Sequence, residues 1–153
     1  MRSEELMQND WVKLARIDIF CKVRAIQADG QIMGETSSGA HFNRKAADLA
    51  PVELTQDIIL RTSFWMKNRN LFKKTVAGIA AFSYMKDIGL LQVKDATTDH
   101  VNNHYITCLH ELQQLYRHYA KQELEVDLSR NKRKEYGQRY NRRKKESDGE
   151  DKG

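Results

Sequence analysis

Residues 19–33 read IFCKVRAIQADGQIM, and this stretch decides how the first part of the chain folds. Two sets of side chains alternate over residues 19–26 and predict a β-strand with two distinct faces. One set is Ile19, Cys21, Val23 and Ala25, and the other is Phe20, Lys22, Arg24 and Ile26. Asp29-Gly30 then predicts a two-residue hairpin turn with positive φ at both positions. Residues 31–33 are the predicted return strand.

Residues 10–14 (DWVKL) form a further strand candidate before this hairpin. These short strands predict a small SH3-like β module over residues 1–50. Its candidate core residues are Trp11, Val12, Val23, Ile32 and Met33. Residues 36–39 are expected to be a loop, and residues 40–49 a short connector of mixed polarity.

Pro51, the single proline of the chain, marks the expected boundary of this module. Proline favours an extended conformation in the residue before it. Thr55 is a good helix N-cap because its hydroxyl can accept a hydrogen bond from the first turn. The apolar positions that follow predict a short helix to about Met66, broken by the polar residues 67–70. These positions are Ile58, Ile59, Thr62 and Trp65.

The stretch from residue 71 to residue 103 is less decisive. Residues 76–85 are apolar and permit either a helix or two strands, and the strands fit better. Residues 87–89 predict a turn and residues 90–93 a return strand. Residues 96–103 are polar and predict a loop.

Residues 106–121 carry the strongest helical pattern of the chain. The apolar positions follow helical spacing and form one stripe. They are Leu109, Leu112, Leu115, Tyr116 and Tyr119. Residues 123–128 then alternate strictly and predict a half-buried strand. We therefore expect an α+β fold, in which residues 51–128 form an α+β unit with two helices packed against the β module.

Charge is distributed unevenly along the 153 residues. Residues 130–145 (RNKRKEYGQRYNRRKK) contain nine basic residues and one acidic residue, a net charge of +8. Residues 146–153 contain four acidic residues and one lysine, while residues 1–129 contain sixteen residues of each sign. The formal net charge of +5 therefore comes from the end of the chain. Because residues 130–145 lack large aliphatic side chains, residues 129–153 are predicted to be a disordered basic tail.

A cationic segment of this kind is typical of nucleic-acid binding, because each cation that meets a phosphate releases a condensed counterion. Two tyrosines among the cations are suited to stacking on single-stranded bases. The candidate contact residues are Arg130, Lys132, Arg133, Lys134, Tyr136, Arg139, Tyr140, Arg142, Arg143, Lys144 and Lys145. The alternatives are a tail that only solubilises the protein, an acidic protein partner, or a membrane surface.

Three histidines, His100, His104 and His110, lie within eleven residues and raise the alternative of a metal-dependent enzyme. The paired asparagines between His100 and His104 favour a loop, which would not place these two histidines on one helical face. Gln114 stands where a zincin motif that begins at His110 needs its second histidine. The sequence therefore predicts no metal site.

Two cysteines, Cys21 and Cys108, are too few for a disulfide framework and fit a reducing cytoplasmic location. Cys108 lies early in the helix predicted over residues 106–121, and a helix N-terminus can lower the pKa of a thiol, but no partner base is evident. The glycines do not form a phosphate loop or a dinucleotide fingerprint. We therefore expect no enzymatic activity and no cofactor. No apolar run approaches the roughly 18 residues of a membrane span, and residues 1–10 do not resemble a signal peptide.

Four blocks of sequence together resemble a known group of proteins. They are ELMQNDWV at residues 5–12, LAPVELT at 49–55, YITCLHELQQLY at 105–116 and ELEV at 123–126. In this order they resemble small uncharacterised proteins of bacterial phage and mobile-element regions, over most of residues 4–128. The basic tail and residues 95–103 depart from that pattern. The resemblance implies a phage or mobile-element context, and it carries over no functional residue.

The sequence thus predicts a non-enzymatic accessory protein that contacts nucleic acid through its tail. The second hypothesis is a protein-interaction module that binds a host or phage protein through the β module. In that case the tail would only keep the protein in solution.

Overall fold

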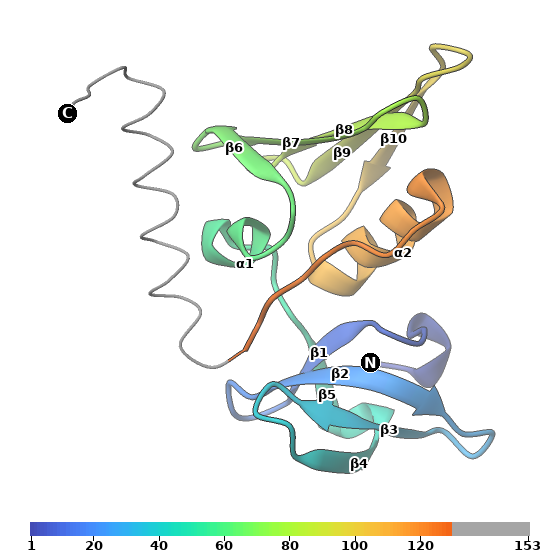
Figure 1. Ribbon diagram of the computed structural model, residues 1–153. Coiled ribbons are helices and arrows are strands. Elements are labelled where there is room, and N and C mark those ends of the chain that lie inside the picture. Colours follow the sequence, from blue (N-terminus) through green and yellow to red (C-terminus); the bar gives the residue numbers. More distant parts are fainter. Residues whose placement is uncertain (130–153) are drawn as a thin grey trace.

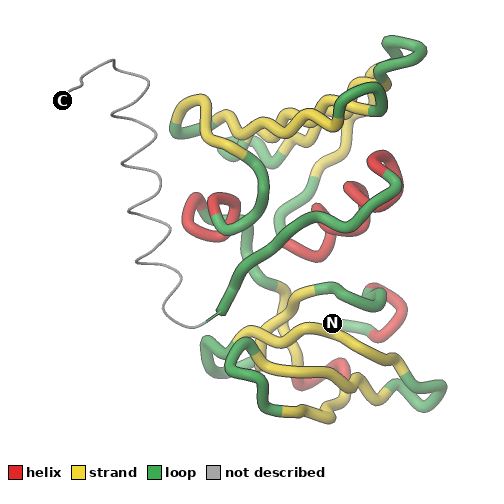
Figure 2. Tube along the Cα trace, viewed as in Figure 1, coloured by secondary structure: helices red, strands yellow, loops and turns green. Residues whose placement is uncertain are grey.

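The computed structural model describes residues 1–129, which form two five-stranded antiparallel sheets and two α-helices (Figures 1 and 2). The expected α+β character is confirmed. Both α-helices lie on one side of the second sheet, between it and the first sheet (Figure 1). The predicted disordered tail lies outside the described residues, except for Ser129.

The first sheet has the strand order β4-β3-β2-β1-β5. Its strands are β1 (Trp11–Leu14), β2 (Phe20–Ile26), β3 (Gln31–Thr36), β4 (His41–Lys45) and β5 (Leu49–Pro51). One 3-10 helix, η1 (Ser3–Glu5), precedes the sheet, and a second, η2 (Ala46–Asp48), links β4 to β5. The expected connector over residues 40–49 is therefore wrong. Phe42 and Leu49 are buried there, and they make this stretch part of the core.

The predicted hairpin joins β2 to β3, but its turn differs from the expected one. Only Gly30 has a positive φ, at 90°. The Gly30 amide donates to the Gln27 carbonyl, and the Gln27 amide donates to the Gln31 carbonyl. The loop is thus one residue longer than predicted, and glycine occupies its single left-handed position.

Side-chain alternation along β2 holds for Cys21 and Val23, which are fully buried, and ends at Ala25, which is exposed. A register shift between Val23 and Ala25 explains the change, because a bulge alters which face the following residues occupy. Next to this bulge, position 34 on β3 must be a glycine. A Cβ atom there would collide with the Lys22 carbonyl oxygen and the Phe42 ring.

Three of the five predicted core residues, Val12, Val23 and Ile32, are fully buried in the first sheet. The prediction that Met33 belongs to the core is wrong, because this residue is 36% exposed. Trp11 is buried, but its side chain belongs to the core of the second sheet. The tryptophan therefore connects the two sheets.

The second sheet is a meander with the strand order β10-β9-β8-β7-β6. Its strands are β6 (Trp65–Asn68), β7 (Leu71–Val76), β8 (Ala80–Met85), β9 (Leu90–Asp95) and β10 (Val101–Tyr105). The strand interpretation of residues 76–85 is confirmed. The predicted loop over residues 96–103 is wrong at its end, because residues 101–103 pair with residues 92–94 of β9.

The first helix, α1 (Gln56–Leu60), starts where the sequence indicates. The Ile58 amide donates to the Thr55 hydroxyl at 3.2 Å, which confirms the N-cap. The predicted extension to Met66 is wrong, because Trp65 and Met66 belong to β6. Thr62 helps to end the helix, since its hydroxyl donates to the Ile59 carbonyl and accepts from the Phe64 amide.

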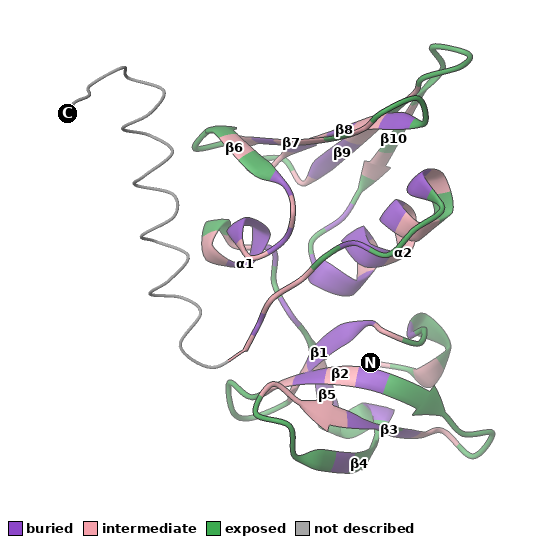
Figure 3. Ribbon diagram, viewed as in Figure 1, coloured by how far each residue is buried: buried purple, intermediate pink, exposed green. Residues whose placement is uncertain are grey.

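The second helix, α2 (Leu109–Ala120), confirms the strongest helical pattern of the sequence. Leu109, Leu112 and Tyr116 are buried from this helix against the second sheet (Figure 3). Tyr116 stacks on Phe82 with ring centroids 4.9 Å apart. The predicted strand over residues 123–128 is an extended segment with one bridge, from Val126 to Thr62.

Candidate functional site

The eleven predicted nucleic-acid contact residues, from Arg130 to Lys145, lie outside the described residues. The structure does describe the point where that segment begins. Ser129 is held by its own hydroxyl and amide, which both donate to the Asp127 carboxylate, at 2.7 and 3.2 Å. The cationic segment therefore starts one residue after a defined turn.

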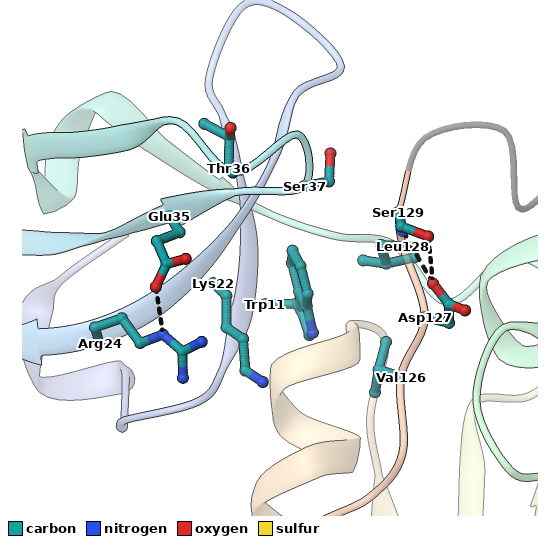
Figure 4. Close-up of a pocket in the computed structure, with 11 residues that line it drawn as sticks. Trp11, Lys22, Arg24, Glu35, Thr36, Ser37, Val126, Asp127, Leu128 and Ser129 are labelled. Atoms are coloured by element: carbon teal, nitrogen blue, oxygen red, sulfur yellow. Dashed lines mark hydrogen bonds and ion pairs between the residues drawn. The ribbon is translucent and has the colours of Figure 1, made fainter.

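A groove of about 290 Å³ lies beside this turn, between the first sheet and the extended segment at residues 126–129 (Figure 4). Its floor is a row of paired residues, since Trp11 pairs with Lys22 and Lys22 with Glu35 across β1, β2 and β3. The groove is also lined by Arg24, Thr36, Ser37, Gly39, Val126, Asp127, Leu128 and Ser129.

The groove holds two cations close to the start of the cationic segment. Arg24 is neutralised by Glu35 at 3.1 Å. Within residues 1–129, Lys22 has no ion-pair partner. Lys22 lies opposite Glu35 across β2 and β3, so the two cations of the groove share it with the carboxylates of Glu35 and Asp127.

The contact between the two sheets is polar and buried. The side chain of Gln113 on α2 accepts from the Trp11 amide at 2.8 Å and donates to the Asn9 carbonyl at 2.9 Å. The adjacent Gln114 donates to the Glu5 carbonyl and to the Asp10 carboxylate. These bonds fix α2 to the start of β1.

Asp10 is completely buried at this contact. Its carboxylate accepts from the Met7 amide at 2.8 Å and pairs with Arg117 at 2.8 Å. Arg117 also pairs with Glu123 at 2.9 Å. Burial opposes the charged form of Arg117, but the hydrogen bonds that it donates to Glu123 and Asp10 raise its pKa above the usual value.

Sequence reasoning missed this buried contact, although all of its glutamines lie in the LHELQQLY block. A polar residue next to an apolar stripe indicates an exposed helix face in most helices. Here Gln113 and Gln114 face the residues around β1, because the first sheet covers that side of α2.

The three histidines that raised a metal site do not meet. His100 is exposed in the loop before β10, and His104 on β10 bonds to the Tyr119 hydroxyl at 2.8 Å. His110 is buried on α2 beside Cys108, at 3.5 Å from its sulfur. Over residues 1–129, no three His, Cys, Asp or Glu side chains are grouped as metal ligands.

Cys108 is the N-cap of α2, yet its thiol is not activated. Burial, together with the hydrogen bond from its sulfur to Glu111 at 3.1 Å, raises its pKa to about 12. The lowering of the pKa that a helix N-terminus can cause does not prevail at this position. Burial also raises the pKa of Cys21 to about 11, so both thiols are poor nucleophiles.

Neither of the two described α-helices is long and apolar enough to cross a membrane. Comparisons of the chain with protein-family models, with curated proteins and with solved structures found no match.

Proposed function

We propose that this protein is a non-enzymatic accessory protein that binds nucleic acid through residues 130–145. The observation that carries the proposal is the charge of that segment, nine basic residues against one acidic residue. Neutralisation of phosphates by these side chains releases counterions and favours binding without regard to base sequence. Tyr136 and Tyr140 add two rings for stacking on bases.

The geometry at residue 129 supports this proposal. Ser129, the last residue before that segment, lies at the rim of the groove that Lys22 and Arg24 also line, and it is bonded to the Asp127 carboxylate (Figure 4). The motif resemblance supports a phage or mobile-element context, and the reduced cysteines support a cytoplasmic location.

Neutralisation of the tail tests the proposal in the full chain. A variant with all nine basic residues of 130–145 changed to glutamine should lose most of its affinity for a fluorescent oligonucleotide. In the unchanged protein, that affinity should fall by about tenfold or more between roughly 50 and 200 mM salt. An affinity that barely changes with salt contradicts the proposal.

A pair of triple variants provides the matched control. Three basic residues of the tail, Arg142, Arg143 and Lys144, are changed to glutamine in one variant. Three exposed basic residues of the first sheet region, Arg16, Arg44 and Lys45, are changed in the other. The proposal requires clearly weaker binding only in the first variant, and equal losses would assign the effect to net charge alone.

A second candidate function is protein interaction through the first sheet, which would be an SH3-like module. The strand order β4-β3-β2-β1-β5 and the 3-10 helix between β4 and β5 support the SH3-like assignment. The groove on the Trp11-Lys22-Glu35 row favours this candidate. Here the tail only solubilises the protein, so the nine-glutamine variant should keep a partner that groove substitutions such as Lys22→Glu lose.

A further inference from the structure

The face of the second sheet that points away from both α-helices carries an unusual set of side chains. Strand pairing places one residue from each strand in a single row across this face. From β6 to β10 the row is Trp65, Lys73, Ser83, Gln92 and Asn103. We call this face the outer face. It also includes Leu71, Met85, Leu90 and Tyr105 on one side of the row, and Thr75, Ala81, Lys94 and Val101 on the other.

The opposite face of the same strands forms the core, and this fixes the orientation of the row. Phe72, Tyr84 and Leu91 pair with one another on the inner face and are buried under the helices. Because side chains alternate along a strand, the outer face carries the residues on either side of them. Figures 1 and 2 show no described helix or strand over that face.

Two aromatic rings are exposed at the two edges of the outer face. Trp65 on β6 is 46% exposed, and Tyr105 on β10 is 75% exposed. Four strand spacings separate β6 from β10, a distance of roughly 19 Å. The row of polar side chains therefore crosses the sheet, and each of the two edge strands carries one solvent-exposed aromatic ring.

The charge of the second sheet is positive. Residues 65–105 contain six basic residues and three acidic residues, so the neutral total for residues 1–129 hides a net charge of +3 on this sheet. The outer face itself includes no aspartate or glutamate. Lys94 pairs with Asp99 at 3.7 Å, whereas Lys73 has no ion pair within residues 1–129.

We infer that the outer face binds single-stranded nucleic acid. Trp65 and Tyr105 stack on unpaired bases, Lys73 meets a phosphate, and Ser83, Gln92 and Asn103 offer hydrogen bonds to bases or sugars. A duplex keeps its bases stacked on one another and cannot offer them to these rings. The inference rests on the proposed function and deepens it, because it selects single strands and adds a second contact surface to the tail.

The experiment measures binding of the full chain to a labelled single strand of about 20 nucleotides, longer than most single-strand sites. DNA and RNA strands of one sequence are compared with the DNA duplex of that sequence. Trp65→Ala and Tyr105→Ala should each weaken single-strand binding about tenfold, the effect of one lost stacked base. Trp65→Phe should restore most of the affinity.

Two matched controls separate the outer face from general surface effects. Lys45→Ala removes one exposed charge from the first sheet and is compared with Lys73→Ala. Ile17→Ala removes an exposed apolar side chain far from the row and is compared with Tyr105→Ala. Only the outer-face variants should weaken binding, and all four should keep the melting temperature of the unchanged protein, because each residue is at least partly exposed.

The chain contains two tryptophans, and this gives an independent readout. Trp11 is 9% exposed and Trp65 is 46% exposed. Stacking on a base should therefore quench the fluorescence of Trp65, and the Trp65→Phe variant should lose that quenching while still binding.

The outcomes distinguish this inference from the proposed function. Full affinity in a Trp65→Ala/Tyr105→Ala double variant, or equal affinity for duplex and single strand, overturns the inference and leaves the tail proposal standing. Unchanged affinity in the nine-glutamine variant overturns the tail proposal, and a loss in the double variant then still supports the outer face. A full chain that binds no nucleic acid at low salt overturns both.

Discussion

The two sheets have the same number of strands and the same antiparallel pairing, but they bury their side chains in different ways. The core of the first sheet contains eight buried residues, and Phe42 is its one aromatic ring. The core of the second sheet contains twenty buried residues, with Phe64, Phe82 and Tyr116 in mutual ring contact. The larger core sits under the helices on one face of the sheet, and over residues 1–129 no helix or strand covers the other face.

The comparison also shows that the first sheet depends on its neighbour. Trp11 lies on β1 but is buried in the second core, and Asp10 beside it is held by α2. A small sheet buries little apolar surface by itself. Much of the stability of the first sheet should therefore come from its contact with α2.

The largest expected effect is in the second core. Phe82→Ala should lower the free energy of unfolding by about 3–5 kcal/mol, because it removes a buried ring and leaves a cavity. Phe42→Ala in the first core should cost less, because that ring lies on an edge strand and packs in the smaller of the two cores. Urea denaturation measures both. A larger loss for Phe42→Ala would reverse the comparison between the two cores.

The contact between the sheets should show the next largest effect. Asp10→Asn weakens a buried ion pair and its hydrogen bonds, and we expect a loss of about 1.5–3 kcal/mol. The exposed Asp18, which pairs with Lys13 at the surface, is the control. Asp18→Asn should change the unfolding free energy by less than about 0.5 kcal/mol. Similar effects for the two variants would show that the sheets are not coupled through Asp10.

The smallest effect concerns the pH dependence of α2. Burial opposes ionisation of Glu111, but hydrogen bonds from Thr107 and Cys108 outweigh it and lower the pKa of the carboxyl. Because the folded-state pKa is lowered, this stabilisation is present above the ordinary pKa of 4.5 and is lost as the pH falls below it.

Glu111→Gln should therefore lower stability by about 1 kcal/mol at neutral pH and flatten the loss of stability in acid. Thermal melts of both proteins between about pH 3 and 7 measure this effect. Glu125→Gln, at an exposed carboxylate that makes no ion pair within residues 1–129, is the control and should leave the acid slope nearly unchanged. Parallel melting curves for Glu111→Gln and the unchanged protein would contradict the assignment.

Several elements were predictable from local sequence because local physics alone specifies them. The alternation of Cys21 and Val23, the Thr55 cap and the stripe of Leu109, Leu112 and Tyr116 each depend on residues within one turn or strand. The predictions failed where distant segments decide the conformation. Residues 65–66 fit the end of a helix and residues 101–103 a polar loop, yet both segments become edge strands because β7 and β9 offer backbone groups beside them.

The outer face could not be recognised from the sequence as long as net charge was summed over all of residues 1–129. A net charge of zero over residues 1–129 suggested no attraction to a polyanion. A count limited to residues 65–105 would have revealed the excess of cations. Even that count cannot show that Trp65, Lys73 and Asn103 form one row, since strand register sets their alignment.

By itself, the sequence determined the Thr55 start of α1, the apolar stripe of α2, the main hairpin and the concentration of charge after residue 129, because propensity, capping and charge are local properties. Only the tertiary structure decided that Trp11 leaves its own sheet for the second core. It also decided that Asp10 is buried against Arg117, and that both described α-helices lie on the same face of the second sheet. These features depend on burial between segments about 100 residues apart, and that burial exists only once both sheets have formed and packed on α2.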